Sequence, residues 1–147
     1  MMTPRREHFR YLRDDPRPIL ITSNPNLGVS GKGFGKIPNP DDPDPTCEGG
    51  KLVIDFVALK TEKERQKHKG RPEVVVAHEL GHIFTAFRNP RKFLNLFAAD
   101  RQGPLYKGYP MSEIQTIINY EDPMRKYLKV PPVFTDSDIQ AIRQKLR

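Results

Sequence analysis

The chain is nearly free of cysteine, with Cys47 as its one thiol in 147 residues. A single thiol excludes an intramolecular disulfide framework and any zinc cluster built from several cysteines. Packing must therefore stabilise the fold. A bound metal could contribute only if side chains other than cysteine provide its ligands. In the turn-rich stretch around it, Cys47 itself predicts no more than a loop thiol.

Long hydrophobic runs are also missing. Residues 1–15 are charged throughout and lack the apolar run of about 7–15 residues that a secretory signal needs. No segment approaches the length of a membrane span. We therefore expect neither a membrane span nor general export. The compatible locations are the cytoplasm and a target cell that is reached through a dedicated secretion machine.

Apolar residues are scarce for a globular protein, at 36% of the chain, whereas there are 15 prolines and 10 glycines. This composition predicts a modest core with long irregular stretches. The length suits one compact domain, to which we assign residues 18–147. Residues 1–17 are polar and rich in arginine, and we expect them to form a loose basic N-terminal arm.

The net charge is +7, which attracts acidic surfaces and phosphate backbones at long range. The basic residues are nevertheless dispersed among acidic ones, and no run of aromatic side chains lies between them to stack on bases. We therefore predict a solvated basic surface and do not expect nucleic acid as a partner.

Two segments have the character of β-strands. Residues 18–22 are a short apolar run, and residues 51–59 are β-branched and apolar between a glycine pair and a charged run. We expect the second segment to lie centrally in a small sheet. Residues 23–50 consist almost entirely of turn formers, and their Gly31-x-Gly33-x-Gly35 lacks the spacing of a dinucleotide fingerprint. This stretch is predicted to be a flexible loop.

A helix is predicted over residues 73–87. Pro72 suits its first turn, Glu73 adds a favourable negative charge at that end, and Asn89-Pro90 ends it. Its apolar residues surround the axis instead of forming one stripe, which predicts a helix that is packed on most sides. His78, Glu79 and His82 are the polar residues that interrupt this apolar surround.

The C-terminal half predicts further helices. One covers residues 91–99, and another begins at Glu113 behind the capping-box pattern Ser112-Glu113-Ile114-Gln115. A short helix follows over residues 122–128, and a closing helix begins near Thr135. The fold class is therefore α+β, with a small sheet packed on the helix at 73–87 and more helices at the C-terminal end.

The spacing of His78, Glu79 and His82 predicts zinc chemistry. Two histidines four residues apart on a helix lie about 40° apart around the axis, so that both imidazoles can reach one ion. Glu79 lies about 100° from His78, which directs its carboxylate to a water that the ion activates. Such a glutamate is the general base of peptide hydrolysis and can later protonate the leaving amine.

A chance match on a core helix is the competing interpretation. Burying two histidines and a glutamate without partners costs free energy, which favours a metal site over chance. Gly81 also lowers helix stability by about 1 kcal/mol relative to alanine. That loss is understandable if another backbone or a substrate approaches closely at this position.

A catalytic zinc usually has three protein ligands and leaves a fourth position to water. Glu113 and Glu121 are the leading candidates for the third ligand, since both lie at predicted helix starts after a loop that can fold back. His8, His68 and Asp55 are further alternatives.

Three segments also carry a resemblance to a known family. They are the strand Ile54-Asp55, the helix Val76-Ala77-His78-Glu79-Leu80-Gly81-His82, and the stretch Ser112-Glu113-Ile114-Gln115-Thr116-Ile117 followed by Glu121-Asp122-Pro123-Met124-Arg125. In these segments the chain resembles the NleD-like zinc metallopeptidases, which occur among bacterial type III effectors and Rhs-type toxin domains. The family has a Glu-x-x-Thr-Ile segment and then a Glu-Asn-x-x-Arg segment after its zinc helix.

The resemblance implies a zincin-like fold in which Glu113 is the third zinc ligand. Glu121 and Arg125 would then support the site or the substrate. Arg125 could stabilise the oxyanion or pair with Glu121 or Asp122, and we favour pairing. The implied biology is an effector or toxin domain that cleaves a protein in a target cell, with a cognate immunity protein as a further partner.

Two alternatives stay open. Asn95-Leu96-Phe97-Ala98-Ala99 is similar to part of the ImmA/IrrE-like regulatory peptidases, but the acidic ligand that should precede it is replaced by Arg91, Lys92 and Phe93. The other alternative is a binding module in which zinc is structural and the basic surface does the binding. A closed fourth ligand would favour that module.

Overall fold

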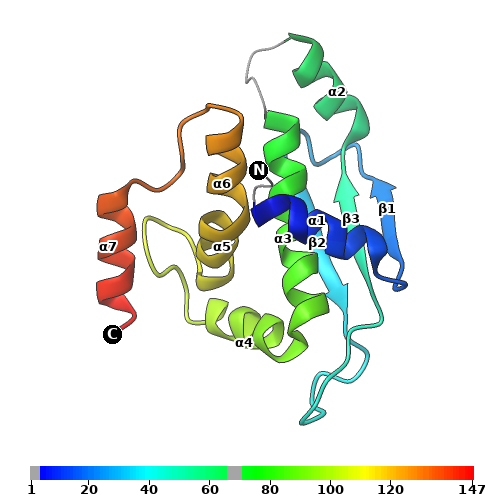
Figure 1. The fold of residues 1–147 in the computed structure, drawn as a ribbon, viewed down its shortest axis with the longest axis vertical. Helices are drawn as coiled ribbons and strands as arrows, with labels where there is room; N and C mark the ends of the chain where they lie inside the picture. The colour runs from blue at the N-terminus through cyan, green and yellow to red at the C-terminus, as the bar shows by residue number, and fades with distance from the viewer. Residues whose placement is uncertain (1–3, 66–70) are drawn as a thin grey trace.

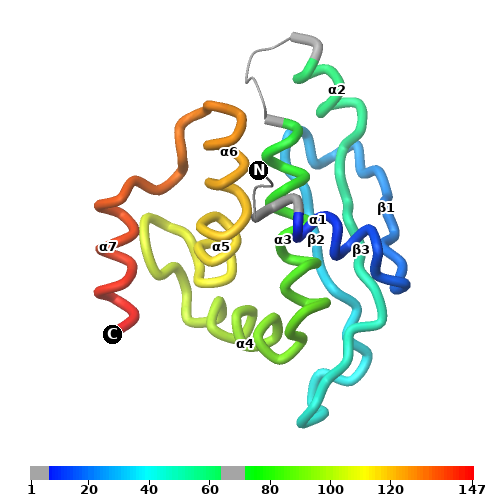
Figure 2. Tube along the Cα trace, in the orientation of Figure 1, coloured from blue at the N-terminus to red at the C-terminus, as the bar shows by residue number. Residues whose placement is uncertain are grey.

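The computed structural model describes residues 4–65 and 71–147. It has mixed α and β structure, as expected, with three strands in one sheet in the order β1-β3-β2. β1 (Ile19–Ser23) runs parallel to the central β3 (Gly49–Ile54), and β2 (Gly31–Lys36) runs antiparallel to it. The prediction of a central strand is confirmed. Figure 1 and Figure 2 show the sheet on one side of the long helix α3 and the C-terminal helices on the other.

The central strand is shorter than predicted. β3 ends at Ile54, and α2 (Phe56–Arg65) begins where residues 56–59 were expected to continue the strand. Asp55 causes the change, because its carboxylate accepts a hydrogen bond from the backbone N–H of Ala58 and so caps the helix. Its other oxygen accepts a hydrogen bond from the N–H of Gly28.

The glycine repeat is a strand and not a loop, so that prediction is wrong. The three alternate glycines of β2 face α3 (Arg71–Arg88) so closely that side chains cannot fit between them. A Cβ on Gly33 would lie 2.1 Å from the backbone oxygen of Glu79, and one on Gly35 would lie 2.3 Å from the Cβ of Ala86. These glycines are present because the strand backbone touches the helix.

α3 confirms the helix predicted over 73–87 and extends it slightly at both ends. It packs against β2 and β3 on one side and against the C-terminal helices on the other. The main core gathers around it, with Ile83 and Ala86 fully buried. The expectation that α3 is packed on most sides is therefore confirmed, and its central residues lie deep in the molecule.

Residues 4–14 of the expected loose arm form a helix, so this part of the prediction is wrong. α1 (Pro4–Asp14) is a helix whose Leu12 belongs to the main core. Its Tyr11 ring packs edge-on against Phe84 of α3, with ring centroids 5.3 Å apart. The prediction overlooked this amphipathic helix because most of its residues are charged. Its few apolar residues are the ones that pack on the core.

The C-terminal half forms a second, smaller core. α4 (Pro90–Asp100) confirms the helix predicted over residues 91–99 with one more residue at each end, and Asn89 is its N-cap. α5 (Met111–Thr116), the π-helical turn η1 (Ile117–Glu121) and α6 (Asp122–Tyr127) follow one another directly, and α7 (Asp136–Lys145) closes the chain behind a Thr135 capping box. Buried side chains from α5, η1, α7 and the loop before α7 pack together, namely Ile114, Ile117, Phe134 and Ile142.

The capping box predicted at Ser112 is wrong. α5 begins two residues before the predicted start, and its N-cap residue, Pro110, makes no side-chain capping hydrogen bond. The hydroxyl of Ser112 instead donates to the carboxylate of Asp100, which also accepts the N–H of Ser112 at 2.9 Å. This contact ties the start of α5 to the end of α4.

Among the described residues, none of the helices has both the length and the apolar character that crossing a lipid bilayer requires.

Candidate metal centre

Two elements from distant parts of the chain meet at His78 and His82. α3 supplies the two histidines and Glu79, and the continuous helical segment of α5, η1 and α6 lies beside it. The candidate ligand atoms of His78, Glu79 and His82 all lie within 4.8 Å of one another. This buried group could hold a metal ion.

The ring of His82 is held from behind by Thr116. The Thr116 hydroxyl donates to the backbone oxygen of Ser112 at 2.8 Å, which uses its one hydrogen. It therefore accepts from His82 Nδ1, which lies 3.2 Å away. A histidine whose Nδ1 is held by an acceptor in this way directs its Nε2 to a metal. Nε2 of His82 lies 3.0 Å from Oε1 of Glu113.

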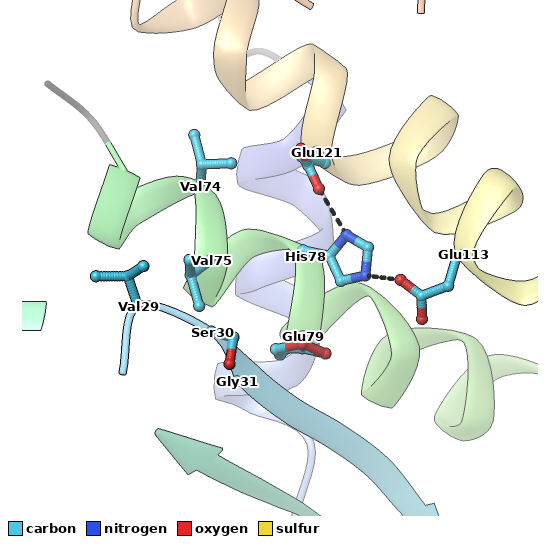
Figure 3. Close-up of a pocket in the computed structure, with 9 residues that line it drawn as sticks. All are labelled: Val29, Ser30, Gly31, Val74, Val75, His78, Glu79, Glu113 and Glu121. Carbon is cyan, nitrogen blue, oxygen red and sulfur yellow. Dashed lines mark hydrogen bonds and ion pairs between the residues drawn. The ribbon is translucent and has the colours of Figure 1, made fainter. Parts of the chain in front are cut away.

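The ring of His78 is held in the same way by Glu121. His78 Nδ1 lies 2.8 Å from Oε1 of Glu121, and its Nε2 lies 2.7 Å from Oε2 of Glu113 (Figure 3). Both carboxylates can only accept hydrogen bonds when ionised, so His78 must donate from both nitrogens. Burial alone would lower the pKa of His78, but the hydrogen bonds to Glu113 and Glu121 raise it to about 10.

Glu113 is the point at which the two imidazoles converge. Burial disfavours a charge on its carboxylate, yet hydrogen bonds from His78 and His82 hold its pKa below the usual range. One oxygen faces each Nε2 atom, at 2.7 and 3.0 Å. The family resemblance implied Glu113 as the third ligand, and the fold brings the Glu113 carboxylate into contact with both histidines.

The donor atoms and their supporting contacts are suited to bind a metal ion. Two imidazole nitrogens and one carboxylate face a common point, and each imidazole has its outer nitrogen fixed by an oxygen, which is the usual support of metal-binding histidines. In the metal-free chain a proton lies between His78 Nε2 and Glu113, where a cation would satisfy the same atoms. The donor set fits a divalent ion that accepts nitrogen and oxygen ligands.

The π-helical turn explains how Glu113 and Glu121 reach the same ring. In a regular α-helix, eight residues turn by about 800°, which is about 80° past two full turns. η1 has one more residue in its π-helical turn, so the chain rotates less over these eight residues. Glu121 therefore lies on the same side of the helical segment as Glu113. Nothing in the sequence marks this turn. It joins two helices that we predicted as separate.

Glu79 lies beside the histidines without sharing their contacts. One carboxylate oxygen lies 3.9 Å from His82 Nε2, and the N–H of Gly33 in β2 donates to the carboxylate. Its side chain is 10% exposed, and this burial raises its pKa to about 7, with the charge of His78 acting in the opposite direction. A carboxylate with such a pKa is suited to accept a proton near neutral pH.

A cleft of about 240 Å³ opens on this group. Figure 3 shows Glu79, His78, Glu113 and Glu121 around it, with the start of β2 opposite α3. An apolar wall completes the lining, formed by Val29, Val74 and Val75. The cleft therefore combines the candidate metal ligands with an apolar surface.

Arg125 pairs with Glu121, the arrangement that we favoured. Its Nε donates to Oε2 of Glu121 at 2.7 Å, and a terminal nitrogen donates to the backbone oxygen of Pro131 at 3.2 Å. Arg125 does not line the cleft. The neighbouring Asp122 accepts the N–H groups of Val133 and Phe134, which ties the following loop to α6.

The other candidate ligands lie elsewhere. Asp55 caps α2, and the His8 ring packs against Phe84 and Tyr120 at 4.5 and 5.0 Å between centroids. His68 lies outside the described residues. Cys47 lies in the loop before β3, as expected, but it is buried against the main core and donates to the backbone oxygen of Gly49.

Another group does approach Gly81 closely, as expected, but this group is a side chain and neither a backbone nor a substrate. A Cβ there would lie 2.5 Å from the ring of Tyr120 in η1. The ring thus sets the distance between α3 and the helical segment that carries Glu113 and Glu121. Thr116 was missed as a supporting residue, although it occupies the threonine of the Glu-x-x-Thr-Ile segment.

Comparison of the chain with protein-family models, curated proteins and solved structures gave no match.

Proposed function

We propose that the chain is a zinc-dependent endopeptidase with His78, His82 and Glu113 as zinc ligands and Glu79 as general base. One observation carries the proposal: both Nε2 atoms converge on Glu113, while Glu79 lies in the same cleft and makes no contact shorter than 3.9 Å with them. A zinc ion held there would supply Lewis-acid activation of water and of the substrate carbonyl. The zincin-like character of the fold belongs to the same proposal.

The residues around the ligands have separate tasks. Glu79 takes a proton from the attacking water and returns it to the leaving amine. Glu121 and Thr116 hold the outer nitrogens of the imidazoles, so that Nε2 of each ring faces the ligand position. Arg125 positions Glu121 through their ion pair. An oxyanion role for Arg125 has less support, because it does not line the cleft.

The cleft supports a peptide as the substrate. β2 is an edge strand, and Gly31 at its start lines the cleft. An edge strand can pair with an extended peptide through backbone hydrogen bonds. The wall of Val29, Val74 and Val75 would favour an apolar side chain next to the cleaved bond. From the family resemblance alone, we further propose that the substrate is a protein of a target cell and that an immunity protein restrains the enzyme.

Metal removal tests the proposed activity. The chain loaded with one equivalent of zinc should cleave members of a mixed peptide library, and chelation should reduce cleavage to background, with recovery when zinc is added back. Mass spectrometry of the products would also reveal the preferred side chains. Zinc binding with a raised melting temperature but no cleavage of any peptide or unfolded protein would instead support the metal-stabilised binding module.

Zinc affinity should depend steeply on pH. Because the pKa of metal-free His78 is raised to about 10, this histidine carries its extra proton throughout the neutral range and must lose it to bind zinc. The apparent affinity should therefore rise about tenfold for each pH unit between about pH 6 and 8. Calorimetry in buffers of different ionisation enthalpy should detect the released proton. An affinity that is constant over this range would contradict the assignment of His78.

Glu121 should affect zinc affinity without being a ligand. In Glu121→Gln the side chain keeps its shape but loses the charge that stabilises the Nδ1 proton of His78 and pairs with Arg125. We expect zinc to bind about 10–100-fold more weakly, with the same set of ligands. Competition with a fluorescent chelator would measure this change. An unchanged affinity would show that the contact does not support the site.

A further inference from the structure

The sheet has a second face, opposite the metal centre. The glycines of β2 point at α3, and neighbouring residues of a strand point to opposite faces, so Lys32, Phe34 and Lys36 point away from α3. In the strand register, Lys51 lies between Phe34 on one side and Leu20 on the other. We call Leu20, Lys32, Phe34, Lys36 and Lys51 the outer face.

The outer face leaves apolar side chains in contact with solvent. Leu20 is 58% exposed and Phe34 is 39% exposed, although both lie within strands. Among the described elements, α3 is the helix that packs extensively on the sheet, and it does so on the other side.

A groove runs over this face. It has a volume of about 530 Å³ and is lined by Pro18, Leu20, Phe34, Gly49 and Lys51, among others. Gly49 lies next to Lys51 in the outward-facing row of β3, and the backbone of Pro18 approaches it so closely that a Cβ would lie 2.6 Å from the Pro18 oxygen. The groove is large enough for an apolar side chain of a partner.

The charges around the groove are mainly positive. Lys36 and Lys51 line it, Lys32 follows on the same strand face, and Glu48 is the acidic residue of the lining. Glu48 lies 4.0 Å from Lys36, and both side chains are more than half exposed, so the pair is weak. The apolar floor is thus surrounded by an excess of lysine.

We propose that the outer face docks an acidic segment of a partner protein, which inserts an apolar side chain into the groove and places carboxylates next to Lys32, Lys36 and Lys51. Apolar anchors surrounded by complementary charge are typical of specific protein interfaces. A second copy of this chain fits poorly, because a symmetric contact would bring the lysines of both copies together. A nucleic acid strand is also less suitable, since Phe34 is the one aromatic side chain among these residues.

The proposal can be tested with a random peptide library displayed on phage and selected on the wild-type chain. The selected peptides should be enriched in aspartate and glutamate next to a large apolar residue. In fluorescence anisotropy, Lys51→Glu and Phe34→Ser should each weaken their binding at least about tenfold. Lys126→Glu is the matched control, because it makes the same charge change on an exposed residue of α6 and should leave binding unaltered.

Circular dichroism and zinc binding should be unchanged in all three variants, because the outer face is separate from the metal centre. Peptides without acidic enrichment, or equal weakening by Lys126→Glu, would overturn the proposal, since binding would then be unspecific. It would equally be overturned if oligo(dT) displaced the selected peptides and bound the wild-type chain more tightly than they do. That result would assign the outer face to nucleic acid.

Discussion

Glu79→Gln should reduce peptide hydrolysis by about 10²–10⁴-fold and leave zinc binding intact. The amide has the shape of the carboxylate and can still accept the N–H of Gly33, but it cannot take a proton from water. The buried carboxylate has a raised pKa, so its neutral replacement should not destabilise the fold. The change therefore separates the chemistry from the assembly of the site.

Two measurements on Glu79→Gln are needed together. Zinc content per chain should equal that of the wild type, and kcat/KM for a cleaved peptide should fall with little change in KM. An active variant would contradict the assignment of Glu79 as general base. An inactive variant without zinc would place Glu79 among the ligands.

Glu113→Gln should lose zinc binding as well as activity. The Glu113 carboxylate contacts both imidazoles. Replacing a residue that only supports a metal ligand weakens binding by about 10–100-fold, so replacing Glu113 by a neutral amide should weaken zinc binding by more than about 100-fold. Activity should fall together with zinc binding. The metal-free chain should remain folded, because Glu113 lies at the cleft and not in either core.

The control for Glu113→Gln is Glu48→Gln, which removes a carboxylate from the far side of the sheet and should leave both zinc affinity and activity unaltered. Competition with a chelator would measure the affinities of both variants. Zinc affinity of the wild-type value in Glu113→Gln would exclude Glu113 as a ligand.

The sequence predicted the parts of the site that depend on local spacing. His78, Glu79 and His82 are neighbours on one helix, and their arrangement follows from helix geometry alone. Glu113 was singled out by a resemblance, and the fold brings its carboxylate to both rings. Its role as a ligand is still a prediction. The outer partners of the rings were harder to foresee, because Glu121 reaches His78 through a π-helical turn.

The errors in the predicted fold have a common physical origin. Apart from Phe34, β2 consists of glycine and lysine, which are depleted in strands, and contact with α3 determines its conformation. α2, which was not among the predicted helices, begins directly after β3 because the side chain of Asp55 caps it. Ser112 bonds to Asp100 in place of its own helix. In each case a long-range contact or a single hydrogen bond outweighed the local propensity.

The metal's coordination sphere tests the central claim most directly. In crystals of the chain loaded with zinc, anomalous diffraction at the zinc edge should locate one ion bound by Nε2 of His78, Nε2 of His82 and the carboxylate of Glu113, at about 2.0–2.2 Å. The fourth position should be open to solvent, with Glu79 facing it. An ion bound elsewhere, or one bound by Glu121 in place of Glu113, would contradict this account. A site closed by a fourth protein ligand would exclude catalysis.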